Sequence, residues 1–181
     1  RDADTLYPSA LADALLGTDI AEQSTQTAGL PDIRAIFNSN VDSDPVCLGG
    51  RKFYYGFDHQ LDRDGNGTRD YASDLLRVML HELAHRLGFS SIVNLATGEG
   101  VRGSDSVERV SIFDQFVYDE STTQGWSQMT AAERLQSSRN SGRLAWNGAR
   151  ANERVSRLAS GVTPNRRLRL YAPAAGSTTG G

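Results

Sequence analysis

The clearest hydrophobic pattern in the chain lies between residues 76 and 87. Leucines and one methionine recur there at spacings of three and four residues, which places them on one face of an α-helix. These residues are Leu76, Met79, Leu80, Leu83 and Leu87. Gly88 follows directly, and a glycine in this position is typical of a helix C-terminus. We therefore predict an amphipathic helix that packs its apolar stripe into a core and ends at Gly88.

Weaker patterns along the rest of the chain indicate short helices and short strands. A helix is expected over residues 7–16, and Thr130 with Glu133 forms a capping box that opens another helix to about residue 138. A polar loop is expected at 19–30 and a glycine-rich loop at 94–105. The predicted strands are residues 32–38, 52–58, 110–118, 144–146 and 167–171. Together these elements predict one α+β domain over residues 1–173, with a small sheet packed on the helix at 76–87, and a flexible tail at 174–181.

Composition narrows the classes of partner. A chain of 181 residues can bury a core without disulfides, and Cys47, its single cysteine, is expected to be a small buried residue or a free thiol. The formal net charge of -3 offers no basic footprint for nucleic acid. No apolar run approaches the roughly 20 residues that span a membrane. We therefore expect neither a nucleic-acid partner nor a membrane span.

Two histidines lie four residues apart on the predicted helix, at His81 and His85, and Glu82 follows the first. Positions i and i+4 share a helix face, so both imidazoles can reach one metal ion. His-Glu-x-x-His is the pattern of zinc metallopeptidases, in which zinc lowers the pKa of its bound water to about 7 and a carboxylate takes the proton. The pattern predicts His81 and His85 as zinc ligands, Glu82 as general base, and a peptide or protein substrate. The alternative is a chance match on an amphipathic helix.

The third zinc ligand is harder to identify. Catalytic zinc usually has three protein ligands, but His59, the remaining histidine, precedes the helix and is expected in a turn. In the compact pattern HExxHxxGxxH the third histidine falls where this chain has Ser91. A carboxylate can complete such a site, and Asp114 is the first choice, although it can equally be a hydrogen-bonded structural carboxylate. The next candidates after Asp114 are three further acidic residues: Asp105, Glu108 and Asp119.

A second candidate metal site precedes the helix. Oxygen-bearing residues alternate from Asp62 onward, with Gly67 at the sixth position, as in calcium loops of the EF-hand kind. The calcium ligands would be Asp62, Asp64, Asn66, the Thr68 carbonyl and Asp70. Position twelve is Ser73, where that loop has a bidentate glutamate, so the closing ligand is missing. The alternative is a polar turn, because turns use the same residue types.

Residues 81–90, HELAHRLGFS, are similar to the corresponding stretch of leishmanolysin-type metallopeptidases. Further short pieces resemble a group of secreted bacterial metallopeptidases, some of which carry a protease-associated domain. These pieces are residues 7–12 (YPSALA), 37–39 (FNS), 54–58 (YYGFD), 113–116 (FDQF), 146–148 (WNG) and 171–173 (YAP). The resemblance implies a zincin-like fold, zinc-dependent peptide cleavage and a location outside the cytoplasm.

The same resemblance bears on the missing ligand. In that bacterial group, a Ser-His-Trp-Asp stretch with the third histidine and a Leu-Met-Glu-Pro stretch follow the Tyr-Ala-Pro element, and neither has a match here. The resemblance therefore favours a fragment of a longer peptidase, and the other explanation is a carboxylate ligand such as Asp114. A rival function stays open: a catalytically silent zincin-like binding or structural domain, with or without calcium, that lacks a complete zinc site.

Overall fold

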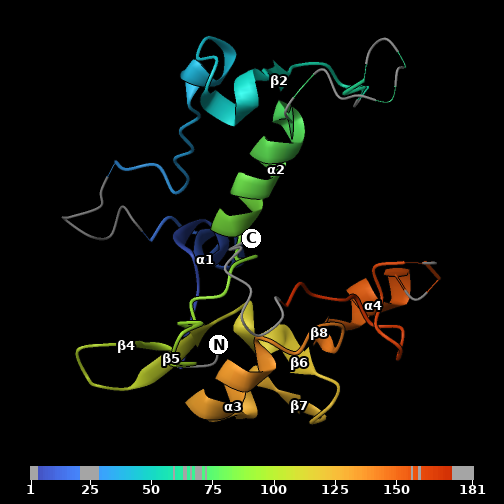
Figure 1. The fold of residues 1–181 in the computed structure, drawn as a ribbon. Coiled ribbons are helices and arrows are strands. Elements are labelled where there is room, and N and C mark those ends of the chain that lie inside the picture. Colours follow the sequence, from blue (N-terminus) through green and yellow to red (C-terminus); the bar gives the residue numbers. More distant parts are fainter. Residues whose placement is uncertain are drawn as a thin grey trace. The chain divides into compact units, whose positions relative to one another are not determined.

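The computed structural model describes residues 4–20, 29–58, 60–62, 65, 67, 71, 73–155, 157–158 and 160–172 (Figure 1). The chain divides into two compact units, which are described separately: unit 1 comprises Arg1–Tyr7 with Ser90–Gly181, and unit 2 comprises Pro8–Phe89. Four α-helices and three small sheets occur in the described part of the chain. The predicted mixture of helices and strands is therefore confirmed. No helix among these residues is long and apolar enough to cross a membrane.

Unit 2 contains two helices and one short parallel strand pair. Helix α1, Ser9–Leu16, ends at Gly17, whose φ of 67° is left-handed, in agreement with the helix expected over residues 7–16. Strand β2 (Phe53–Tyr54) pairs in parallel with β3 (Ser73–Asp74), and α2 (Leu75–Arg86) follows β3 directly. Only two residues of the strand predicted at 52–58 form a ladder. The stretch 32–38, also predicted as a strand, is irregular and pairs with no strand among the residues that the structure describes.

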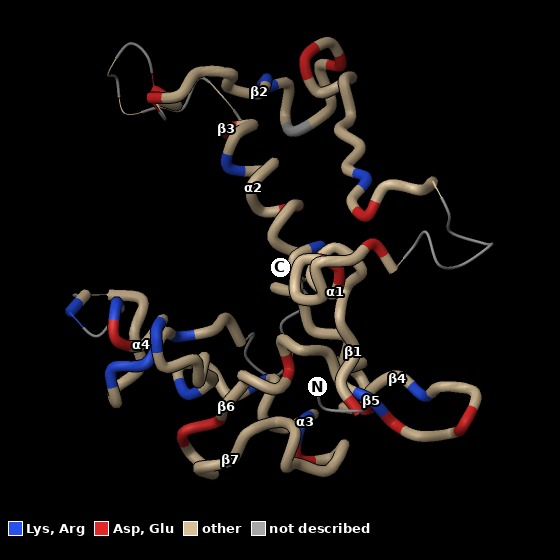
Figure 2. The backbone as a smooth tube through the Cα atoms, turned by 180° about the vertical axis from the view of Figure 1, so that it is seen from behind, with Lys and Arg blue, Asp and Glu red and all other residues tan. Residues whose placement is uncertain are grey.

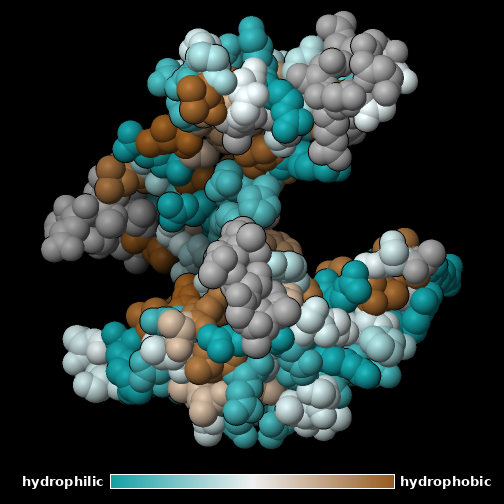
Figure 3. Space-filling view, viewed as in Figure 1, coloured by the Kyte–Doolittle hydropathy of each residue, from teal (hydrophilic) through white to brown (hydrophobic). Residues whose placement is uncertain are grey.

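The apolar stripe of α2 is less buried than its pattern predicts. No residue of this helix is fully buried, and Met79, Leu80 and Leu87 keep 37%, 59% and 45% of their surface exposed. Within the described part of unit 2, Val41 is the single buried hydrophobic residue, so this unit offers no layered core against which the stripe could pack. Hydrophobic side chains accordingly lie at the surface around α1 and α2 (Figure 3). The described part of unit 2 thus does not provide the core that the stripe of α2 predicts.

Unit 1 is built on two three-stranded sheets. In the first, β5 (Glu108–Ser111) lies between the parallel β1 (Thr5–Leu6) and the antiparallel β4 (Val101–Arg102). In the second, the order is β7-β6-β8. The bounds of its antiparallel strands are Gln124–Gly125 for β7, Val117–Asp119 for β6 and Leu144–Trp146 for β8. The hydrophobic core of unit 1 comprises Val93, Val110, Val117, Trp126, Met129, Leu144 and Ala172.

The helices and loops of unit 1 agree with the sequence patterns in part. Helix α3, Ala131–Ser137, starts with the predicted capping box, and β8 coincides with the predicted strand at 144–146. The segment 110–118 is interrupted by a 3-10 turn, Asp114–Phe116, and 167–171 forms only isolated bridges. Helix α4, Ala149–Val155, has no apolar stripe and was not predicted. The tail at 174–181 lies outside the described residues.

Candidate metal centre

The helix that carries the histidines begins at a buried carboxylate. Asp74, with 2% of its surface exposed, accepts hydrogen bonds from the backbone N–H groups of Leu76 (2.9 Å) and Arg77 (3.3 Å). These two N–H groups belong to the first turn, where no helical carbonyl can reach them. Asp74 also pairs with Tyr54 in the β2–β3 ladder. A strand pair and a cap therefore fix the start of α2 together.

The other end of α2 is closed by a Schellman turn. The Gly88 N–H donates to the His85 carbonyl (3.1 Å), and the Phe89 N–H donates to the Ala84 carbonyl (3.0 Å). Gly88 has a φ of 95°, which L side chains rarely adopt. The helix end that the sequence predicts at this glycine is confirmed. The turn brings the Phe89 carbonyl back over the last turn of the helix.

The two imidazoles meet at their Nε2 atoms. His81 Nε2 lies 3.0 Å from His85 Nε2, and the ring planes are inclined by 81°. His85 Nδ1 lies 3.0 Å from the Phe89 carbonyl oxygen. A carbonyl can only accept, so His85 Nδ1 donates to it, and in the neutral imidazole this places the lone pair on Nε2. Orientation of a ligating histidine by such a hydrogen bond is usual in metal sites.

This pair of nitrogens fits one transition-metal ion. Two ligand nitrogens at zinc distances and a tetrahedral angle stand about 3.3 Å apart, so the observed 3.0 Å requires only a small ring rotation. Imidazole nitrogen is also a donor that zinc prefers. His81 and Glu82 are exposed and His85 is half-buried, so solvent and a peptide can reach all three. The structure thus brings together the two predicted histidines, with the predicted base next to one of them in the chain.

Asp114, the predicted third ligand, belongs to unit 1, whereas the histidines belong to unit 2. Its side chain is completely buried, and its Oδ2 accepts from Ser111 N (2.9 Å), Ser111 Oγ (2.7 Å) and Ile92 N (3.4 Å). Its Oδ1 has no hydrogen-bond partner among the described residues. These donors support the interpretation of Asp114 as a structural carboxylate. Its role as a zinc ligand stays a prediction.

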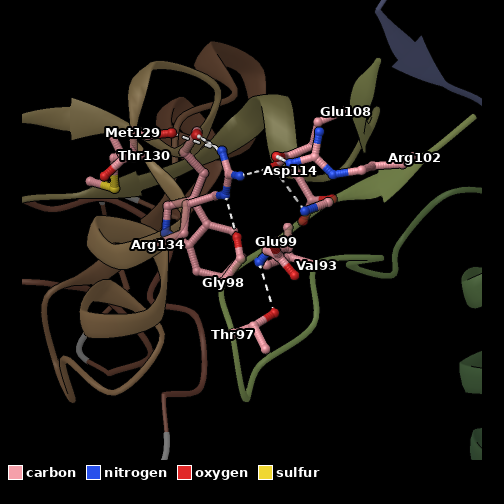
Figure 4. Close-up of polar contacts among 12 residues, drawn as sticks. Val93, Thr97, Gly98, Glu99, Arg102, Glu108, Asp114, Met129, Thr130 and Arg134 are labelled. Atoms are coloured by element: carbon pink, nitrogen blue, oxygen red, sulfur yellow. Dashed lines mark hydrogen bonds and ion pairs between the residues drawn. The ribbon is translucent and has the colours of Figure 1, made fainter. Parts of the chain in front are cut away.

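Glu108 is held by a polar network of unit 1 that the sequence did not reveal (Figure 4). The Gly100 N–H (2.9 Å) lowers the pKa of Glu108, burial opposes it, and the guanidinium groups of Arg134 and Arg102 add to the lowering. Arg134 is itself buried and also donates to the carbonyls of Gly98 (2.7 Å) and Met129 (2.8 Å). Glu108 therefore balances the positive charge of the buried Arg134 guanidinium.

Asp105 and Asp119 also have protein donors. Hydrogen bonds from the Arg109 guanidinium, at 2.6 and 2.9 Å, hold the pKa of Asp105 well below its usual range. Burial raises the pKa of Asp119, but hydrogen bonds from Ser121 and Asn140 hold it below its usual value. Like Glu108, both carboxylates belong to unit 1 and already accept hydrogen bonds from protein groups there.

The predicted calcium loop is described only in part. Asp62 accepts from the N–H groups of Gly65 (2.9 Å) and Gly67 (2.8 Å), and both glycines have positive φ. Such a tight loop is compatible with a calcium loop and with a polar turn. Four of its predicted ligands, and also His59, lie outside the described residues: Asp64, Asn66, Thr68 and Asp70. Calcium binding stays a prediction.

Two features of unit 2 were not foreseen from the sequence. The Phe89 carbonyl is a backbone group without a residue signature, although Gly88 after the second histidine could have indicated the turn that places it. A cluster of Asp13, Asp19 and Asp32 brings one carboxylate oxygen from each within 4.8 Å of the others. Burial, followed by the charge of Asp13, raises the pKa of Asp32. These three residues are separated along the chain by spacings that match no motif.

Comparisons with known proteins return no relative of this chain. No protein-family model, no curated protein and no solved structure matches it. A functional assignment therefore rests on the residues and on their geometry.

Proposed function

We propose that this protein is a secreted zinc-dependent endopeptidase with a zincin-like fold, in which His81 and His85 hold the metal and Glu82 is the general base. The observation that carries the proposal is the 3.0 Å approach of the two Nε2 atoms on successive turns of α2. The hydrogen bond between His85 Nδ1 and the Phe89 carbonyl supports it, because it leaves the Nε2 lone pair available.

In this proposal, each of the three residues of α2 has a separate role in catalysis. When bound, zinc supplies a Lewis acid and lowers the pKa of water to about 7. His85 is kept in one tautomer by the Phe89 carbonyl, and His81 brings the second nitrogen from the preceding turn. The Glu82 carboxylate takes a proton from the attacking water and returns it to the leaving amine. Its exposed position allows it to reach a peptide at the helix surface.

The third ligand is part of the proposal and has two candidates. One is Asp114, and the other is a histidine outside the 181 residues of this chain. Two histidines alone should bind zinc more weakly than a three-ligand site. We therefore expect measurable zinc binding but low peptidase activity if the third ligand lies outside this chain. Strong, chelator-sensitive hydrolysis by this chain would favour Asp114.

Replacing Glu82 by glutamine tests the proposed base. Glu82→Gln keeps the size of the side chain and removes its basicity, so the variant should retain zinc and lose casein hydrolysis by at least about 100-fold. A matched control is Glu99→Gln, which changes another exposed glutamate, in unit 1, and should leave both properties unchanged. Equal hydrolysis rates for the Glu82→Gln variant and the parent would exclude Glu82 as the base. The assay is run on a form of the protein whose casein hydrolysis is stopped by a zinc chelator, so that a loss of activity can be measured.

The rival function is a zincin-like binding or structural domain without catalysis. The observation that favours it is that the candidate third ligands of unit 1 already accept protein hydrogen bonds or ion pairs: Asp105, Glu108, Asp114 and Asp119. A protein that binds zinc through His81 and His85 but cleaves no peptide in any extended form would support this alternative.

A further inference from the structure

Unit 2 contains an aromatic cavity beside β2, and its lining residues are not those of the proposed metal centre. Its volume is about 460 Å³, which lies in the usual range of small-molecule sites, about 300–1,000 Å³. Phe53, Tyr54, Tyr55 and Tyr71 line it, together with the polar side chains of Asp58 and Gln60. Four aromatic side chains around one cavity offer several ring faces to a ligand.

The aromatic side chains are held in place by specific contacts. The rings of Tyr54 and Tyr71 have their centroids 5.1 Å apart and are tilted by 58°. Gly56 lies against the Tyr54 hydroxyl, and a Cβ atom at this position would collide with it. A glycine is therefore needed for the Tyr54 side chain to keep its place in the wall of the cavity.

Two of the phenols donate to carboxylates. Tyr54 Oη donates to Asp58, and Tyr55 Oη donates to Asp42. The hydrogen bond to Asp42 raises the pKa of Tyr55, so this phenol stays protonated and remains a donor. Donation to an anion pushes electron density into the phenol ring and makes the ring face more negative. Such a face attracts a cation more strongly than an isolated phenol does.

The charged residue in the described lining of the cavity is acidic. Asp58 lines it, and no Arg or Lys is among the lining residues that the structure describes. Acidic residues occur in the segments before and after β2, and two basic residues, Arg51 and Lys52, directly precede it (Figure 2). Unit 1 shows that this protein forms the corresponding contact internally, because the Arg167 guanidinium lies 4.3 Å from the centre of the Tyr118 ring.

We propose that this cavity binds an organic cation, a guanidinium or ammonium group, between the tyrosine rings and the Asp58 carboxylate. In a peptide, the ligand would be an arginine or lysine side chain. The site is independent of the proposed peptidase activity, because none of its residues belongs to the metal centre. A neutral sugar, which also stacks on aromatic rings, is the competing ligand and makes no use of the negative charge.

The proposal can be tested with a pair of ligands that differ only in charge. N-acetyl-arginine amide and N-acetyl-citrulline amide have nearly the same shape, but only the first is a cation. Each is titrated into the full chain with ¹³C-labelled tyrosine rings, and the six ring signals are assigned by single Tyr→Phe substitutions. Arginine amide should shift the signals of Tyr54, Tyr55 and Tyr71 and bind about fivefold tighter than citrulline amide, a difference of about 1 kcal/mol.

Substitutions separate the contribution of the charge from that of the shape. Asp58→Asn should abolish the preference for arginine over citrulline, and Tyr55→Phe, which keeps the ring, should reduce it about twofold. Tyr171→Phe, at an exposed tyrosine of unit 1, is the matched control and should change nothing. Equal affinities for the two ligands would overturn the proposal. So would shifts confined to Tyr118 and Tyr171, or binding of methyl glucoside without binding of arginine amide.

Discussion

Replacing Gly88 tests whether the C-terminal turn of α2 orients His85 for a metal. Gly88 has a φ of 95°, and the Schellman turn around it places the Phe89 carbonyl 3.0 Å from His85 Nδ1. Valine is β-branched and strongly disfavours positive φ, whereas asparagine tolerates it better than most residues. Gly88→Val and Gly88→Asn therefore change the same position with different strain on the backbone.

The expected magnitudes follow from the contacts at the turn. A non-glycine residue forced to positive φ costs about 1–2 kcal/mol, and a lost hydrogen bond adds about 1 kcal/mol. We expect Gly88→Val to lower the free energy of unfolding by about 2–3 kcal/mol and Gly88→Asn by about 1 kcal/mol. Loss of a group that orients a metal ligand weakens metal binding by about 10- to 100-fold. Zinc affinity should therefore fall markedly in the valine variant and by less in the asparagine variant.

The assay combines urea unfolding with zinc competition against a chromophoric chelator. A second pair of variants keeps the backbone unchanged: Nδ1-methylhistidine, incorporated at position 85 or at position 81. The methyl group removes the Nδ1 donor but leaves Nε2 free. At His85 it should weaken zinc binding by about 10-fold or more. At His81, whose Nδ1 has no hydrogen bond within the part of the chain that the structure describes, the effect should be smaller.

Two results would refute this reasoning. If Gly88→Val destabilises the protein as expected but binds zinc like the parent, the Phe89 carbonyl does not orient His85. If methylation at His81 and at His85 weakens zinc binding equally, the hydrogen bond to Phe89 has no special role. Either result would leave the proposed zinc ligands standing, because both tests concern the orientation of one ligand.

Three further predictions concern other parts of the chain. The full chain should retain about one zinc ion per molecule after dialysis, whereas the His81→Ala, His85→Ala double variant should not; equal metal content would contradict the two-histidine site. Millimolar calcium should raise the midpoint of thermal unfolding, because calcium at ten times its dissociation constant adds about 1.4 kcal/mol to the free energy of unfolding. Asp62→Ala should remove this shift, and an unchanged midpoint in the parent would favour the polar turn. Glu108→Gln should lower the free energy of unfolding by about 3 kcal/mol, because buried Arg134 loses its counter-ion. The folded-state pKa of Glu108 lies below its ordinary 4.5, so this contribution is present above that pH and is lost as the pH falls through the folded-state pKa. Unfolding in urea from pH 7 to pH 3 should therefore show a smaller loss of stability in the variant than in the parent, because the other carboxylates with lowered pKa values, Asp105 and Asp119, titrate in both proteins.

The features that were predictable from the sequence are those set by neighbouring residues. Helix α2 and its end at Gly88 follow from periodicity and from turn chemistry, and the capping box of Thr130 and Glu133 needs only a spacing of three. The meeting of the two imidazoles follows in the same way from one helical turn.

The strands depend on distant partners and were harder to predict. Strand β1 pairs Thr5 with Val110, and nothing near either residue indicates the other. The apolar residues at 32–38 resemble a strand but find no ladder, whereas Phe53 and Tyr54 do because Ser73 and Asp74 lie beside them. Strand preference mainly reflects how a side chain fits its neighbours in a sheet, so short strands without a clear alternation cannot be located from local sequence.

The same distinction explains which parts of the candidate site remain open. His81, Glu82 and His85 lie on one helix, so their relation is local and could be read from five consecutive residues. A third ligand must come from another segment, and the local pattern holds no information about which one. The four acidic residues chosen by type each meet donors of their own unit, among them Ser111 at Asp114 and Arg109 at Asp105. Such donors do not exclude metal binding, because a carboxylate can keep hydrogen bonds on one oxygen while the other binds a metal. Of the four residues, Asp114 keeps one oxygen, Oδ1, without a hydrogen-bond partner among the described residues. Asp114 therefore stays the first choice among the carboxylates of unit 1, and its role as a zinc ligand stays a prediction.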